Sequence, residues 1–251
     1  MRLFDSHCHL EDPAFDPDRE EVIERARRAG LVGIVTSPLG AEEGEKSLSL
    51  FRRSDLVLVS VGIDPEDELS REEVDETISF IEEVADEIVA VGEVGLDYRV
   101  ARESWQRERQ KETFSRFIRL AEELDKPIVV HSLWAQRPAL RVLDREGASR
   151  VLLHAFGGTP EDVKFAAERG WMISVGTNVV RSTNVQRVAR STPLENLCLE
   201  SDSPVLAPEP RERNEPANIS KSVRFLAKML DLEAEELADI ATENSGSLYG
   251  V

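Results

Sequence analysis

The chain has 251 residues, with 49 acidic side chains against 31 basic ones and a formal net charge of −18. So acidic a composition argues against non-specific binding of nucleic acid, which needs a basic surface. The two cysteines are too few for a disulfide framework, and no apolar run approaches the ~18 residues of a membrane span. Because the N-terminus also lacks the apolar core of a signal peptide, we expect a cytoplasmic protein.

Short apolar segments alternate with helical patterns along the chain. Residues 56–61 are continuously apolar, which is typical of a strand buried on both faces. Apolar residues recur at helical spacing before Gly30, and Thr159 followed by Pro160 is typical of a helix start. The predicted strands cover residues 3–9, 32–36, 56–61, 88–93, 126–131, 150–154, 171–175 and 197–202. The predicted helices cover residues 16–30, 42–53, 72–85, 103–124, 138–146, 159–170, 185–191, 218–230 and 233–242.

This alternation of strands and helices predicts the fold. Eight strands, each followed by helical sequence over about 250 residues, match a (β/α)8 barrel. We therefore predict an α/β fold, a (β/α)8 TIM barrel, formed by a single domain that spans residues 1–251. The alternative is a doubly wound open sheet, but no Gly-x-Gly-x-x-Gly turn follows the first strand.

The first strand carries the pair His7 and His9. On a strand, residues two apart lie on one face, so both imidazoles can bind one ion of the Zn²⁺ class. Alone, such a pair is as well explained by two surface histidines. However, the chain has only four histidines, and the other two, His131 and His154, also lie at the ends of predicted strands.

In a barrel, the carboxyl ends of the strands meet at the active face. The nitrogen and oxygen donors expected there are His7, His9, Glu93, His131, His154 and Asp202. Such a set suits two divalent metal ions, with Glu93 placed to bridge them. Asp202 would bind one ion and accept the proton of an attacking water, so Glu93 and Asp202 are the predicted catalytic residues. Taken singly, each residue has a structural explanation: a buried core histidine, a capping glutamate or a turn aspartate.

Other residues are candidates for substrate contacts or for packing. Trp134, just after His131, can stack on a base or act as a hydrophobic lid. Arg211 and Arg213 follow the last strand and can grip a phosphate, or pair with Glu209, Glu212 or Glu215 on the surface. Asp97 is explained equally well as a turn residue and as a substrate contact. Cys8 and Cys198 are interpreted as small buried packing residues.

Together these motifs resemble the TatD-like metal-dependent deoxyribonucleases of the amidohydrolase superfamily. The resemblance covers nearly the whole chain and is carried by FDSHCHL at 4–10, GEVGLDY at 92–98, PIVVH at 127–131, HAFGG at 154–158, ESDSP at 200–204 and RNEP at 213–216. It implies a TIM barrel, two divalent ions and hydrolysis of DNA phosphodiesters. It also implies that one ion is held by His7, His9, Glu93 and Asp202, and the other by Glu93, His131 and His154.

The sequence departs from the family pattern at two places near the expected substrate position. Many members have Gly-Ile-His-Pro after the third strand, where this chain has Asp64 in Gly-Ile-Asp-Pro. Many also have an arginine soon after the strand-five histidine, where this chain has Ser-Leu-Trp at 132–134.

The predicted function is therefore metal-dependent hydrolysis of DNA ends, with two ions of Zn²⁺, Mg²⁺ or Mn²⁺. One alternative is a hydrolase of a small-molecule ester, amide or lactone that uses the same centre. The other is a catalytically silent metal-binding barrel, which a complete set of six donor residues disfavours.

Overall fold

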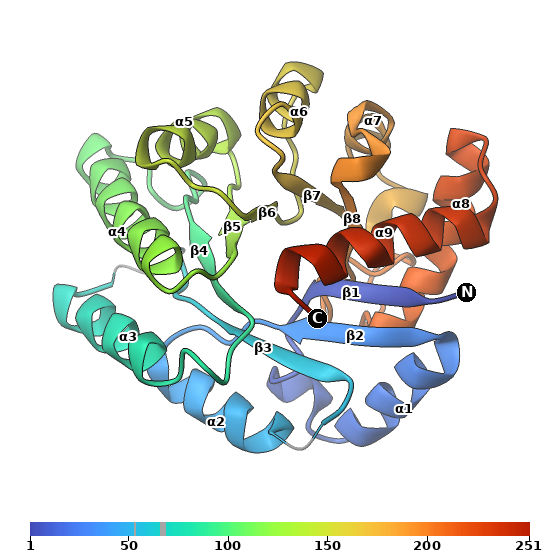
Figure 1. The fold of residues 1–251 in the computed structure, drawn as a ribbon, viewed down its shortest axis with the longest axis horizontal. Helices are drawn as coiled ribbons and strands as arrows, with labels where there is room; N and C mark the ends of the chain where they lie inside the picture. The colour runs from blue at the N-terminus through green and yellow to red at the C-terminus, as the bar shows by residue number, and fades with distance from the viewer. Residues whose placement is uncertain (53, 66–68) are drawn as a thin grey trace.

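The computed structural model describes residues 1–52, 54–65 and 69–251. Its strands form one parallel sheet in the order β1 to β8, surrounded by helices, which confirms the predicted barrel (Figure 1). The strands are β1 (Leu3–Cys8), β2 (Leu31–Thr36), β3 (Val57–Val61), β4 (Ala90–Gly95), β5 (Ile128–His131), β6 (Val151–Leu153), β7 (Met172–Val175) and β8 (Leu197–Leu199). The α-helices are α1 (Arg19–Ala29), α2 (Ala41–Phe51), α3 (Arg71–Glu83), α4 (Ser104–Glu123), α5 (Gln136–Glu146), α6 (Pro160–Ala167), α7 (Thr183–Ser191), α8 (Ile219–Leu230) and α9 (Ala234–Tyr249). Short 3-10 turns cover Pro13–Phe15, Thr177–Val180, Leu194–Asn196 and Pro216–Asn218.

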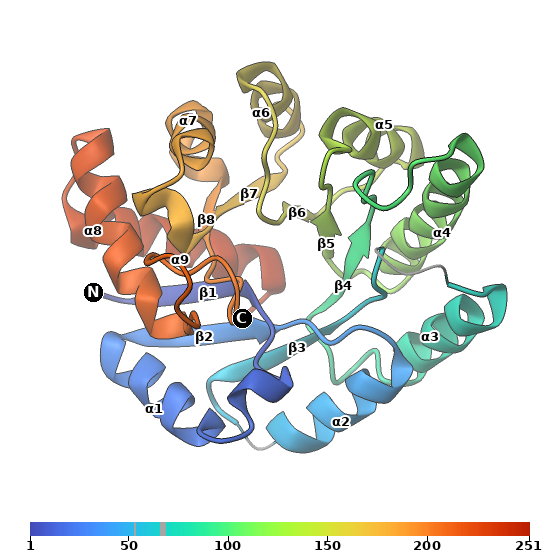
Figure 2. The same ribbon diagram turned by 180° about the vertical axis from the view of Figure 1, so that it is seen from behind.

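The barrel closes between β8 and β1 through the residues that follow β8. The backbone N–H of Asp202 donates to the carbonyl of His7 at 3.0 Å, and the N–H of His9 donates to Ser203 at 2.8 Å. The buried carboxylate of Asp5 accepts from the backbone and the hydroxyl of Ser201, at 2.8 and 2.6 Å. The loop after β8, orange in Figure 2, is therefore fixed against β1. Asp202 of this loop consequently lies beside His7 and His9.

Local sequence signals explain where most helices begin and end. Gly30 and Gly147 adopt left-handed conformations that end α1 and α5, as glycine allows at this position. Thr159 and Asp162 form a reciprocal capping box at the start of α6. That helix ends at Ala167 rather than at the predicted Gly170, because the intervening residues form a turn in which the N–H of Trp171 returns to Ala166. The predicted end of the second helix, Arg53, lies outside the described residues.

The last helix differs most from its prediction. The prediction ends this helix at residue 242, and the residues that follow include Asn, Ser and Gly, which form helices poorly. Instead α9 continues to Tyr249 and buries Ser245, Leu248 and Tyr249. The Tyr249 hydroxyl donates to the carbonyl of Ser6 at 2.7 Å, and its ring stacks against Phe4. Tertiary contacts therefore outweigh local helix propensity here.

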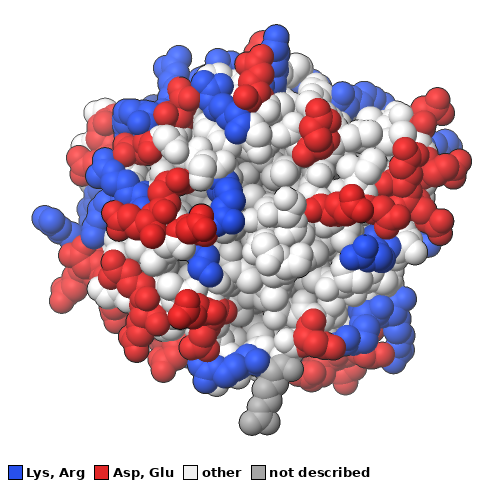
Figure 3. All heavy atoms as spheres, viewed as in Figure 1, with Lys and Arg blue, Asp and Glu red and all other residues white. Residues whose placement is uncertain are grey.

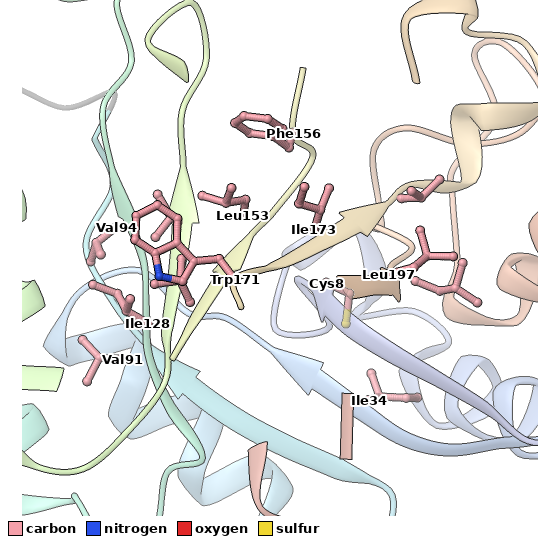
Figure 4. Packing of buried hydrophobic residues seen from close by; sticks show 14 of the residues in the cluster. Cys8, Ile34, Val91, Val94, Ile128, Leu153, Phe156, Trp171, Ile173 and Leu197 are labelled. Carbon is pink, nitrogen blue, oxygen red and sulfur yellow. The ribbon is translucent and has the colours of Figure 1, made fainter. Parts of the chain in front are cut away.

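Alternating strand residues form two separate apolar layers. Ile128, Leu153, Ile173 and Leu197 belong to the layer that packs against the helices, as Figure 4 shows for the surroundings of Trp171. The second layer fills the barrel near the amino ends of the strands. It comprises Phe4, Val35, Ala90, Val129, Leu152 and Cys198, closed from outside by Leu248 and Tyr249 of α9. Among the described residues, no helix is long and apolar enough to cross a membrane.

Candidate metal centre

The alternation of faces along β5 and β6 places two donors inside the barrel above this inner layer. In β5, Val129 faces inward, and His131 lies two residues further along. His154 bears the same relation to Leu152 of β6. Their side chains therefore occupy the carboxyl end of the barrel interior, which is the active face of this architecture.

In β1 and β4, irregular pairing places the other inward donors. The β1–β2 register shifts between Asp5 and Cys8, and the β4–β5 register shifts between Val91 and Val94. Each shift interrupts the strict alternation of faces, so Phe4 packs in the inner layer although His7, three residues later, also faces the centre. Ala90 and Glu93 are related in the same way. Each bulge therefore turns a donor side chain toward the centre and leaves the inner apolar layer intact.

The first group of donors surrounds one oxygen of Glu93. Its Oε2 lies 3.4 Å from Nε2 of His7 and 3.5 Å from Nε2 of His9. Asp202 Oδ1 lies 3.6 Å from Nε2 of His7 and 3.9 Å from Nε2 of His9. Two imidazoles and two carboxylates thus lie together, and the ligand atoms of His7 and Asp202 also lie within 4.8 Å of a ring nitrogen of His154.

The second group surrounds the other oxygen of Glu93. Its Oε1 lies 2.7 Å from Nδ1 of His131 and 2.9 Å from Nε2 of His154. The ligand atoms of these three residues all lie within 4.8 Å of one another. Glu93 is therefore the only one of the six predicted donors whose two oxygens each face a different pair of histidines.

Each of the four histidines also contacts a polar side chain on its outer side. The Nδ1 of His7 bonds Ser37 at 3.1 Å, and the Nδ1 of His9 bonds Glu11 at 3.0 Å. The remaining pairs are His131 Nε2 with Asp97 Oδ2 at 3.3 Å and His154 Nδ1 with Glu200 Oε2 at 3.5 Å. Such outer partners orient imidazole ligands and fix which ring nitrogen carries the proton.

The electrostatics of the cluster fit bound cations. The Nε2 of His7 is buried and has no hydrogen-bond partner among the described residues, as expected for a nitrogen reserved for a metal. Burial and the charge of His154 lower the pKa of His7, which favours the neutral form that metals bind. Burial alone would raise the pKa of Glu93, but His154, His131 and His7 outweigh it and hold that pKa well below its usual range. Burial would lower the pKa values of His9, His131 and His154, but the surrounding carboxylates, Glu93 among them, raise all three. The carboxylates of the cluster therefore favour positive charge at its centre.

Asp202 lies in the loop just after β8 and is buried. Its backbone is left-handed, with φ of 51°, which non-glycine residues adopt only when their surroundings fix them. Burial raises the pKa of Asp202 above its ordinary value, although the charge of His154 opposes the shift. A carboxylate with a raised pKa accepts a proton more readily than an exposed one, which suits a general base.

The structure places the predicted substrate contacts less closely together. Trp134 is 69% exposed in the loop after β5, and Arg211 is exposed in the loop after β8. Arg213 instead binds both carboxylate oxygens of Asp18, each at 2.7 Å, and covers the ring of Phe15. Its partner is thus none of the three glutamates weighed from the sequence.

Sequence reasoning missed most of the outer partners of the histidines. The sequence analysis predicts no role in the site for Glu11, Ser37 or Glu200, and it explains Asp97 equally well as a turn residue and as a substrate contact. Glu200 offered one signal, because it lies two residues before Asp202 and thus on the same strand face. Glu11 offered the same kind of signal, because it lies two residues after His9.

Comparisons with known proteins give the family of the chain. A family model described as TatD related DNase matches residues 4–250. Deoxyribonuclease TATDN3 of Homo sapiens is 38% identical over 98% of this chain and 94% of that protein. The chain belongs to the TatD family. An uncharacterized metal-dependent hydrolase of Methanocaldococcus jannaschii is 34% identical to this TatD protein, over 99% of the chain and 97% of that protein.

Structural similarity extends over the whole TatD fold. The crystal structure of YJJV, a TatD homologue from Escherichia coli K12, has a TM-score of 0.91 and 26% identity, and the match covers 100% of this chain and 98% of that one. The predicted family and barrel are thereby confirmed. As a TatD-family member, the protein is a metal-dependent hydrolase.

Proposed function

We propose that this TatD protein hydrolyses phosphodiesters at DNA ends with two divalent metal ions, Zn²⁺, Mg²⁺ or Mn²⁺. The observation that carries the proposal is the division of Glu93 between two histidine pairs, His7 with His9 and His131 with His154. DNA as the substrate is supported by the name of the human relative, a deoxyribonuclease. Membership of the amidohydrolase superfamily is part of this proposal.

In this proposal, one ion is held by His7, His9, Glu93 and Asp202, and the other by Glu93, His131 and His154. Bound there, the ions would polarise the scissile phosphate and lower the pKa of a water molecule. Asp202 accepts the proton of the attacking water at its carboxylate. The outer partners keep the imidazoles oriented while this proton moves.

For substrate contacts we propose the exposed residues of the loops after β5 and β8. Trp134 offers a flat face on which a terminal base can stack. Arg211 is exposed and can reach a phosphate. Arg213 can do so only by leaving Asp18, so its proposed contribution is smaller.

A hydrolase of small esters, amides or lactones is the second candidate function. It is favoured by the net charge of −18, which repels a phosphate backbone. It is also favoured by Asp64 and by the Ser-Leu-Trp segment at 132–134, which stand where many family members have histidine and arginine. Single-stranded DNA labelled at its 3′ or 5′ end, assayed beside a panel of small esters, separates the two functions.

Metal binding gives the first test of the proposal. Apoprotein titrated with Zn²⁺ should bind about two ions per chain, as two-metal hydrolases do. His131→Ala should reduce this to about one, because it removes a donor from the second group only. Trp134→Ala is the matched control, since it changes a neighbouring exposed residue and should leave both ions bound. Unchanged metal content in His131→Ala would remove His131 from the site, and absence of hydrolysis of any DNA substrate would reject the DNA assignment.

A further inference from the structure

A buried carboxylate in the loop after β4 contacts the second group of donors from outside. The Asp97 residue is fully buried, and its Oδ2 lies 3.3 Å from Nε2 of His131. Its other oxygen, Oδ1, accepts a hydrogen bond from the backbone N–H of Arg99 at 2.7 Å. Oδ1 therefore shapes the turn, whereas Oδ2 faces both the histidine and the guanidinium of Arg99, whose Nη2 lies 3.3 Å away.

The backbone of Asp97 is held in place by α4. The side-chain oxygen of Gln110 accepts from the N–H of Asp97 at 3.1 Å. The side-chain nitrogen of Gln110 donates to the carbonyl of Asp97 at 3.2 Å and to that of Pro65 at 2.6 Å. Because these bonds join the loops after β3 and β4 to one helix, the position of the carboxylate is fixed relative to the barrel.

His131 is oriented differently from the other three histidines. It turns Nδ1 toward Glu93, whereas His7, His9 and His154 turn Nε2 toward it. A neutral imidazole that binds a metal through Nδ1 carries its proton on Nε2. In His131 this is the nitrogen that faces Asp97, so the carboxylate can accept that N–H.

We propose that Asp97 is a positioning residue that keeps His131 in the Nε2-protonated tautomer and thereby makes Nδ1 the donor to the second metal ion. This inference rests on the proposed function, because it requires a metal held by Glu93, His131 and His154. It assigns to Asp97 a role that neither a turn residue nor a substrate contact would have.

Two substitutions separate positioning from a merely structural role. In Asp97→Asn, the side-chain oxygen can still accept from Arg99, which turns the NH₂ group toward Nε2 of His131. That group can only donate, so it favours the tautomer with the proton on Nδ1 and blocks the metal donor. Asp97→Ala removes the turn bond but imposes no tautomer. Positioning therefore predicts that Asp97→Asn impairs the second metal site more, whereas a structural role predicts that Asp97→Ala does.

The experiment is calorimetric titration of the wild-type and variant apoproteins with Zn²⁺, together with ¹⁵N NMR of the four imidazoles in the zinc-loaded proteins. We expect Asp97→Asn to weaken the second ion by about 10- to 100-fold, as loss of an outer partner typically does, and to leave the first ion unchanged. Only His131 should lose its Nε2-protonated signature. Asp97→Ala should weaken the second ion less.

Asp12→Asn is the matched control, because the Asp12 side chain accepts from the backbone N–H of Ala14, and the bond from Asp12 to His9 runs from its backbone N–H to the His9 carbonyl, which the substitution keeps. It should bind both ions like the wild type. Equal affinities in wild type and Asp97→Asn, or a weaker second ion in Asp97→Ala than in Asp97→Asn, would overturn the inference while the proposed function stands. If the wild type binds fewer than two ions, the proposed two-metal function fails and the inference fails with it.

Discussion

At the scale of single residues, Glu93 and Asp202 have different surroundings in the candidate metal centre. One carboxylate oxygen of Glu93 faces the pair His7 and His9, and the other faces the pair His131 and His154. Asp202 lies near His7 and His9, and also near His154, and stands in the loop after β8. This difference suits Glu93 to bridging and Asp202 to proton transfer.

The first residue-scale prediction concerns Asp202→Asn, which preserves size and removes basicity. Hydrolysis should fall by a factor of ~100 or more, because a general base contributes about that much. The fold should persist, since the backbone bonds that close the barrel at Asp202 and Ser203 do not involve the side chain. Steady-state kinetics and circular dichroism would check both statements. A variant with near-normal turnover would show that another group takes the proton.

At the scale of elements, α9 has a structural task at the opposite end of the barrel. Leu248 and Tyr249 pack under the inner apolar layer, which lies toward the amino ends of the strands, while the donors lie two or more residues further along them. The end of α9 therefore covers the barrel interior at the amino ends of the strands and does not reach the candidate metal centre. Its continuation beyond residue 242 follows from this burial.

The element-scale prediction follows from that packing. Leu248→Ala should lower the free energy of unfolding by about 2 to 5 kcal/mol, because it removes a buried side chain and leaves a cavity. Val251→Ala is the control, since Val251 is 63% exposed and its loss should change stability little. Urea unfolding measures both, and metal content should stay the same in both variants. Equal stabilities of the two variants would show that the end of α9 does not seal the barrel.

At the scale of the whole molecule, charge dominates the encounter with DNA. The formal net charge is −18, and acidic side chains are spread with basic ones around the outer helices on the face shown in Figure 3. Several arginines of the described surface are paired with carboxylates, as Arg25 is with Glu215 and Arg213 with Asp18. The molecule as a whole therefore repels a phosphate backbone, and affinity must come from the centre and from base stacking.

The corresponding prediction concerns salt. The Debye length falls from about 30 Å at 0.01 M salt to about 8 Å at 0.15 M, which weakens the repulsion between protein and DNA. Accordingly, kcat/KM for an oligonucleotide should rise over this range, while that for any neutral ester should stay constant. A basic nuclease shows the reverse trend, because salt weakens its phosphate contacts. If kcat/KM for DNA instead falls with salt, local cations such as Arg211 govern binding.

Local patterns in the sequence predicted the barrel, which the structure confirms, and the six candidate donors, which the structure brings together. Hydrophobic alternation and helix-ending glycines are local signals, so they predicted the order of the elements and placed His131 and His154 at strand ends. The family motifs then predicted a division of the donors between two ions that share Glu93, and this division stays a prediction.

Only the tertiary structure decided the features that depend on residues far apart in the chain. The contact of Asp97 with His131 spans 34 positions, and that of Arg213 with Asp18 spans 195. The bulges in β1 and β4 also depend on distant residues, because they arise between paired strands. The length of α9 depends on its packing against the inner apolar layer. Local propensity contains no information about such partners, since the energy that favours them comes from packing and hydrogen bonds formed only in the folded chain.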